Sequence, residues 1–163
     1  MINAPIPVNE KERLEATKKL GILDTIAEER FDQLTREAAE KLGVPISAIS
    51  IIDENREWYK SCYGMDVKEG DRNISFCGHT ITEPEDILVV EDTLKDDRFA
   101  NNPYVLGEPF VRFYAGVRIF DRKTKMPVGV FCVKDKKPRT LSIDELAVVL
   151  DCAARAEEEI NKK

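Results

Sequence analysis

The spacing of the apolar residues changes twice along this chain of 163 residues. From Phe31 to Leu42 the apolar side chains recur at helical intervals, whereas Ile46–Ile52 is apolar on both alternations, as in a strand that is buried on both faces. Helical spacing returns after Ser142 and continues to Ile160. Helices at both ends and a series of strands between them predict an α+β domain around an antiparallel sheet.

Start and stop signals indicate where the terminal helices begin and end. Asn9 and Thr25 each precede a glutamate by three residues, the spacing of a capping box, and the two helical runs end at Gly21 and Gly43. The apolar stripes expected to cover the sheet are Leu14 and Leu20 in the first helix and Phe31, Leu34, Ala38 and Leu42 in the second. We expect one domain over residues 1–163, made of an extended arm (1–8), N-terminal helices (9–43), a sheet with pocket loops (44–140) and a C-terminal helix (142–161).

The middle of the chain alternates between expected strands and polar loops. The further strands predicted after Ile46–Ile52 are Trp58–Tyr63, Ile87–Val90, Val111–Phe120 and Val128–Lys134. Loops are expected over 65–73 and 93–109, with one or two helical turns over 74–81 that Ser75 can cap. Ser142 and Glu145 form a capping box for the last helix.

Composition excludes several classes of protein. The formal net charge is −6 and no concentrated basic patch occurs, so we expect no nucleic-acid partner. No apolar run approaches the roughly 20 residues that span a bilayer, and the N-terminus carries no secretory signal, so we expect a cytoplasmic protein that is not in a membrane. With four dispersed cysteines, no C-x-x-C and a single histidine, we expect reduced thiols and no metal site.

Several segments, in their order and spacing, resemble a known family over nearly the whole chain. They are Leu23-Asp24-Thr25 with Phe31-Asp32, Ile49–Asp53, Ser75–His79, Asp97–Phe99 with Asn102-Pro103, Arg112–Gly116 and Pro138-Arg139. Together they resemble a GAF domain, the small sensory module found ahead of histidine kinases, cyclases and phosphodiesterases. The resemblance implies a six-stranded antiparallel sheet with the terminal helices on one face and a ligand pocket on the other, and a homodimer formed through those helices.

No effector sequence follows the domain, so the chain is either an excised piece of a larger signalling protein or a protein that works alone. Met1 and the ordinary N-terminal arm favour the free-standing protein.

The residues expected to form the ligand pocket lie between Ser75 and Arg139. Arg98, Asn101 and Asn102 occupy the long loop, where a guanidinium fork and amide groups could bind a carboxylate or phosphate. Aromatic walls are expected from Phe76 and from either Phe113 or Tyr114, because neighbouring residues of a strand point to opposite faces. The remaining candidates for ligand binding are Asp92, Cys77, His79 and Cys132.

Cys77, His79 and Cys132 also suggest alternatives, although packing is the simpler role for each. Cys77 and Cys132 could form the attacking and resolving thiols of a free methionine sulfoxide reductase, an activity known in one GAF subfamily. Cys77 could instead anchor a bilin, or His79 could ligate haem. Cys77 and His79 are two residues apart in an expected helical turn, so they do not face each other, and we predict no catalytic dyad.

We therefore expect a non-enzymatic sensory module that binds a small molecule and signals through its terminal helices. The sequence assigns no cofactor, and it leaves the ligand open among nucleotides, small carboxylates and other anions. The downstream effector is open as well.

Overall fold

A computed structural model describes residues 1–162 of the chain. The α-helices are α1 (Glu10–Leu20), α2 (Glu29–Leu42), α3 (Phe76–Thr80), α4 (Pro103–Leu106) and α5 (Ile143–Ile160). The strands are β1 (Ile46–Ile52), β2 (Arg56–Tyr63), β3 (Glu69–Asp71), β4 (Ile87–Val90), β5 (Phe113–Phe120) and β6 (Pro127–Asp135). Within this range no helix is both long enough and apolar enough to cross a membrane.

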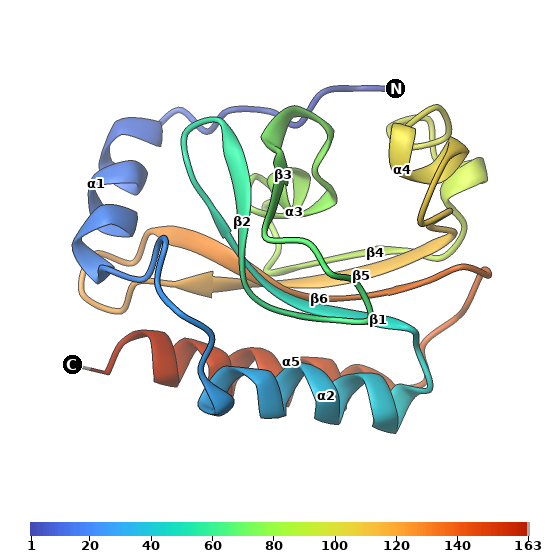
Figure 1. Cartoon of the computed structure of the whole chain (residues 1–163). Coiled ribbons are helices and arrows are strands. Elements are labelled where there is room, and N and C mark those ends of the chain that lie inside the picture. The colour runs from blue at the N-terminus through green and yellow to red at the C-terminus, as the bar shows by residue number, and fades with distance from the viewer. Residues whose placement is uncertain (163) are drawn as a thin grey trace.

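The strands form one six-stranded sheet in the order β3-β2-β1-β6-β5-β4, and every neighbouring pair is antiparallel. β1 and β6 therefore lie at the centre, which agrees with the doubly apolar pattern of Ile46–Ile52, every residue of which is buried. Figure 1 shows α2 and α5 side by side across one face of the sheet, with α3 and α4 on the other. The predicted α+β fold is confirmed.

The core between the sheet and the helices α2 and α5 is built from alternate residues of the strands. Ile49 of β1, Phe113 of β5 and Phe131 of β6 all face α2 and α5, and each is fully buried. The predicted stripe of α2 meets them, because Phe31 and Leu34 are at most 1% exposed. Burying a large apolar side chain contributes about 1.5–3 kcal/mol, so this layer holds the two helices firmly on the sheet.

Helix α1 has a different role from the one its apolar residues suggest. It lies at the ends of the strands, and it buries Arg13, Ala16 and Thr17 while Leu14 and Leu20 remain half-buried. The Nη1 of Arg13 donates to the carbonyl of Ile52 at 2.8 Å, so the helix satisfies backbone acceptors where β1 ends. The first helix ends at Gly21, as predicted, with φ at +67°.

Neither predicted N-terminal cap forms in the first two helices. The side chain of Asn9 does not cap α1, and its amide donates instead to the sulfur of Met126 at 3.4 Å. Helix α2 begins at Glu29, three residues later than a cap at Thr25 would place it. The hydroxyl of Thr25 is unavailable as a cap because it donates to the carbonyl of Ile22 and accepts from the Nζ of Lys60.

The other caps agree with the sequence. The hydroxyl of Ser75 accepts the N–H of Gly78 at 2.9 Å and begins α3, and Ser142 with Glu145 forms the predicted capping box of α5. The region 65–73, expected to be a loop, contains β3, a short polar strand that pairs only with β2. The long segment 93–109 contains a 3₁₀ turn at Thr93–Lys95 and the short helix α4.

The N-terminal arm crosses the α3 side of the sheet. The N–H of Ile2 donates to the carbonyl of Arg98 at 3.2 Å, and the N–H of Ala4 donates to the carbonyl of Asn73 at 2.9 Å. Gly78 of α3 passes so close to Ala4 that a side chain at residue 78 would collide with it. These contacts hold the arm against the domain.

Candidate functional site

The aromatic residues predicted to form a pocket fill the core beneath α3. The ring of Phe76 stacks on Phe99 with 4.5 Å between centroids and on Tyr114 with 5.1 Å. None of the three rings is more than 1% exposed. Phe113, the neighbour of Tyr114 on β5, faces α2 and α5 in the opposite core. The structure thus places Tyr114 on the α3 side and fills the expected space with aromatic side chains.

Cys77 and Cys132 lie next to each other in this same core, and neither is exposed. The hydroxyl of Tyr114 lies 2.6 Å from that of Thr80 and donates to the Sγ of Cys77 at 3.3 Å. Burial raises the pKa of the Cys77 thiol well above its ordinary value, whereas a hydrogen bond with Cys77 lowers the pKa of Cys132. The reductase hypothesis requires an exposed Cys77 with a low pKa, and the structure shows a buried thiol with a raised one.

His79 is buried and already has a hydrogen-bonding partner. Its Nε2 lies 3.1 Å from the carbonyl oxygen of Ile2 in the N-terminal arm, and its ring packs edge-on against Phe99 at 4.8 Å. Burial lowers the pKa of the imidazole, so the ring is neutral near pH 7 and donates from Nε2 to this carbonyl. The imidazole therefore holds the arm in place, and Nε2 is not open to a haem iron.

Arg98 already forms ion pairs with two carboxylates, one in its own loop and one just after α3. Its Nη2 donates to Asp96 at 2.8 Å and its Nη1 to Glu83 at 3.0 Å. Hydrogen bonds from Arg98 hold the pKa of the Asp96 carboxyl below its usual range. The guanidinium links Asp96 of the long loop to Glu83 after α3 and so holds these two segments together.

The other polar candidates of the long loop act mostly as local caps. The carboxylate of Asp92 accepts the N–H of Leu94 at 3.1 Å. Asn102 is buried, caps α4, and donates from Nδ2 to the carbonyl of Ile74 at 2.9 Å. Asn101 is exposed. These side chains organise the loop and do not converge on a common space.

A cavity of about 350 Å³ lies elsewhere on this side of the sheet, where β1, β2 and β6 meet α4 and the loop between β2 and β3. Its apolar and aromatic lining consists of Pro45, Ile46, Tyr59, Gly64, Met65, Val67, Tyr104, Pro109 and Val111, and its charged lining of Glu69, Glu108, Lys134 and Lys136. None of the residues predicted from the sequence to bind a ligand lines this cavity. A volume of this size and a mostly apolar lining are typical of small-molecule sites.

Lys134 is the most unusual residue of the cavity, because its side chain can carry a charge and yet it is only 4% exposed. It follows Cys132 on the same face of β6, and its Nζ lies 5.7 Å from the ring centroid of Phe76. Burial acts to lower the pKa of Lys134, but the neighbouring Cys132, Glu57, Cys77 and Cys62 together raise it more, so the net pKa is raised. The lysine is therefore an ammonium ion at neutral pH. A charged residue at the end of the apolar run Val128–Val133 was the one signal in the sequence that could have indicated this site.

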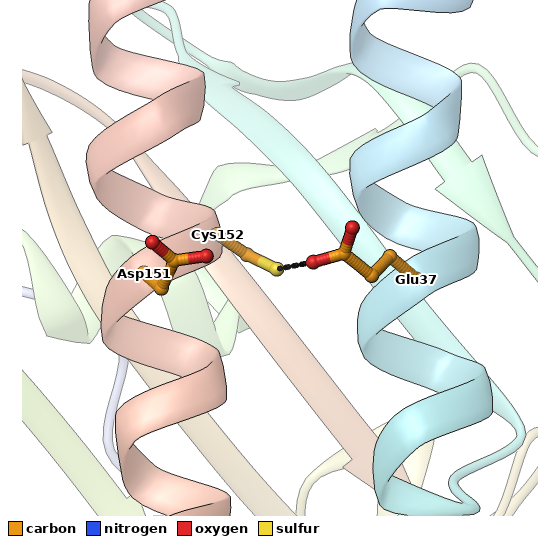
Figure 2. A group of neighbouring side chains, drawn as sticks. All are labelled: Glu37, Asp151 and Cys152. Atoms are coloured by element: carbon orange, nitrogen blue, oxygen red, sulfur yellow. Dashed lines mark hydrogen bonds between the residues drawn. The ribbon is translucent and has the colours of Figure 1, made fainter.

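A second cluster, made of side chains of the kinds that can bind a metal ion, lies between α2 and α5. Figure 2 shows Glu37 of α2 facing Asp151 and Cys152 of α5, and the ligand atoms of the three residues lie within 4.8 Å of one another. The Nη1 of Arg155 donates to Glu37 at 2.7 Å and to Asp151 at 3.2 Å. Because a guanidinium already neutralises both carboxylates, the cluster is an ion-pair link between the helices.

These features define the class of protein. The six-stranded antiparallel sheet and its flanking helices are those of GAF domains of known structure, and residues 27–160 match the family model "GAF domain". The chain belongs to the GAF family.

Particular relatives agree with this assignment. A cyclic di-GMP phosphodiesterase of Pseudomonas aeruginosa is 34% identical over 155 residues, which is 95% of this chain and 26% of that protein. The chain thus spans about a quarter of the length of this curated relative. The GAF domain of an Acinetobacter phosphoenolpyruvate-protein phosphotransferase matches 91% of this chain and 92% of its own at 21% identity, with a TM-score of 0.65. A type II free methionine-R-sulfoxide reductase of Thermoplasma acidophilum matches 91% of this chain and 94% of its own at 12% identity, with a TM-score of 0.62.

The Pseudomonas relative corrects one prediction. The sequence led us to expect a non-enzymatic protein, whereas this relative is named for an enzymatic activity and is similar over nearly the whole chain. The likeness to the sulfoxide reductase, at 12% identity, shows the shared fold alone.

Proposed function

We propose that this chain is the small-molecule-binding, regulatory part of a cyclic di-GMP signalling enzyme system. The observation that carries the proposal is the cavity at β1, β2 and β6, which combines a mostly apolar lining with a buried ammonium ion at Lys134. The similarity to a cyclic di-GMP phosphodiesterase supports the choice of signalling system. The effector would be the part of such a protein that this chain does not match.

The position of the cavity suggests how occupancy could reach the rest of a protein. Lys134 and Val133 are neighbours on β6, yet Lys134 lines the cavity while Val133 packs in the core beneath α2 and α5. A ligand that shifts the end of β6 would therefore act on the packing of both helices. It would transmit a signal only if it bound more tightly to one arrangement of the helices than to the other.

The outer face of α5 suggests a homodimer. Ile143, Ala147, Leu150 and Ala154 are exposed and recur at intervals of four, three and four residues, which is the spacing of a coiled-coil seam. Ile143 is 88% exposed and Leu150 is 44% exposed. We propose that two copies pair along this stripe in a two-fold symmetric dimer. Sedimentation velocity would show a dimer for the wild type and a monomer for Leu150→Glu, and a wild-type monomer at high concentration would refute this pairing.

A chimera tests the regulatory role. The chain would replace the matching 155 residues of the Pseudomonas phosphodiesterase, and cellular cyclic di-GMP would be measured in the host. Val67→Trp places an indole in the cavity, whereas Val89→Trp changes a valine of similar exposure on β4, away from the cavity. We expect Val67→Trp to change the cyclic di-GMP level by about fivefold or more, the lower end of typical allosteric coupling, and Val89→Trp to leave it unchanged. Equal levels in the two chimeras would show that the cavity does not control the output.

A further inference from the structure

Two lysines of the sheet are almost completely buried, and they differ in their partners. Lys60 is 3% exposed, and its Nζ donates to the Thr25 hydroxyl at 2.8 Å and to the Ile26 carbonyl, and it pairs with Glu28 at 2.7 Å. Lys134 is 4% exposed, yet among residues 1–162 no carboxylate forms a salt bridge with its Nζ and no acceptor takes a hydrogen bond from it. An ammonium group has three donors, and leaving them without acceptors in a low-dielectric site is costly. The free donors of Lys134 border the cavity, so water or an anion bound in the cavity would supply their acceptors.

The nearby acidic residues are already engaged. Glu57 is the acid that most favours the charge of Lys134, but one of its oxygens accepts from the Ser50 hydroxyl at 2.5 Å and the other from the Tyr59 hydroxyl at 2.9 Å. At the mouth of the cavity, Glu69 pairs with Arg56 at 3.1 Å.

The last acid of the lining, Glu108, pairs with Lys136 at 4.0 Å. Of the four charged residues that line the cavity, Glu69 and Glu108 thus have cationic partners and Lys136 has an anionic one. The positive charge of Lys134 is the one left without a contacting counter-ion among the described residues.

The size and lining of the cavity restrict the anion that could supply this charge. An inorganic ion would contact Lys134 but leave most of about 350 Å³ unfilled. The rings of Tyr59 and Tyr104 and the side chains of Pro109 and Val111 offer apolar surface that only an organic group could cover. Acid group and apolar body must therefore belong to the same molecule.

We propose that the cavity binds a small organic anion whose carboxylate, phosphate or sulfonate group contacts the Nζ of Lys134 and whose apolar or planar part lies against Tyr59 and Tyr104. This inference rests on the proposed role of the cavity as a ligand site and adds the chemical class of the ligand. Lys134 supplies the charge recognition, and the aromatic side chains supply the contact area.

A pair of fluorescent probes tests the inference. 8-Anilinonaphthalene-1-sulfonate carries a sulfonate, and N-phenyl-1-naphthylamine has the same ring skeleton without it. We expect the wild type to bind the sulfonate more tightly, and Lys134→Met to weaken its binding about tenfold or more while leaving the neutral probe within twofold. Lys11→Met removes an exposed lysine of α1 that does not line the cavity and is the control, with both probes expected within twofold of the wild type. Lys134→Gln keeps a hydrogen-bond donor without the charge and replaces Lys134→Met should the latter not fold.

The outcomes distinguish a failure of the inference alone from a failure of the function on which it rests. If both probes bind the wild type and Lys134→Met equally well, and Val67→Trp blocks them, the cavity is a ligand site but the ligand class is wrong. If the sulfonate still binds to Val67→Trp as it does to the wild type, it lies outside the cavity and the inference fails. If neither probe binds the wild type, the inference and the proposed ligand site fail together.

Discussion

We predict that Glu10, at the start of α1, contributes substantially to the free energy of unfolding. It accepts from two buried arginines at once: from Arg13 at 2.7 and 3.2 Å, and from Arg72 at 3.2 Å with a second, shorter bond to the Nη1 of Arg72. Arg13 is fully buried and Arg72 is 2% exposed. Glu10→Gln removes the shared negative charge and leaves two buried guanidinium ions without their counter-ion.

The expected loss follows from the burial of the partners. Removing one member of a buried ion pair costs about 3–5 kcal/mol. Because the side chain of Glu10 is 18% exposed, and because both arginines keep backbone carbonyls as acceptors, we expect the lower value, about 3 kcal/mol. At about 2–4 °C per kcal/mol for a chain of this size, the Tm should fall by about 6–12 °C.

Urea unfolding followed by circular dichroism would measure the effect. Glu12→Gln is the matched control, because Glu12 lies in the same first turn of α1, is exposed and has the same helix-dipole interaction. We expect the control to change the free energy of unfolding by no more than about 0.5 kcal/mol. Equal unfolding midpoints for the two variants would refute the argument that the buried arginines depend on Glu10.

The same carboxylate predicts a dependence on pH. Burial acts to raise the pKa of Glu10, but the hydrogen bonds from Arg72 and Arg13 lower it more, so the net pKa lies below the ordinary value of 4.5. A lowered carboxyl pKa contributes stability that is fully present above pH 4.5 and is lost as the pH falls through the folded-state pKa. The stability difference between the wild type and Glu10→Gln should therefore be constant near neutral pH and shrink in acid.

Three further outcomes are expected. Ser142→Ala removes the capping box of α5 and should lower the free energy of unfolding by about 1 kcal/mol in urea titration, whereas an unchanged midpoint would contradict the cap. Gly64→Ala would place a Cβ 1.9 Å from the carbonyl oxygen of Pro45 at a φ of +88°, so we expect a loss above about 2 kcal/mol or failure to fold, and wild-type stability would disprove it. In alkylation followed by mass spectrometry, native Cys62 should react before Cys77, because Cys62 is partly exposed while Cys77 is buried. Burial raises the pKa of Cys62 to about 11, so its reaction should accelerate as the pH rises from 8 to 10, and faster labelling of Cys77 would contradict the structure.

The sequence could predict the parts of the fold that depend on neighbouring residues. Periodicity located β1, β4 and α5, and the caps at Ser75 and Ser142 form as expected, because each depends on side chains within a few positions. A predicted helix cap failed to form where the capping side chain instead bonds to a residue that is distant in the sequence. Thr25 would cap a helix by itself, but its hydroxyl interacts with Lys60, 35 residues away.

The site depended on tertiary structure in the same way. Cys77 and His79 are chemically distinctive and close together in the sequence, yet Cys77 fills a core and His79 holds the N-terminal arm. The cavity instead joins Tyr59, Tyr104 and Lys134, which come from β2, α4 and β6 and share no sequence motif.

The sequence by itself determined the family, the order of five of the six strands and of the three long helices, and the core beneath α2 and α5, because apolar periodicity and local capping act over short distances. Only the tertiary structure decided which charges are paired. Lys60 and Lys134 look alike in the sequence as single lysines within β-rich runs, yet one meets Glu28 and the other borders a cavity. The physical reason is that the cost of a buried charge depends on what lies within a few ångströms of it, and the folded chain alone sets those neighbours.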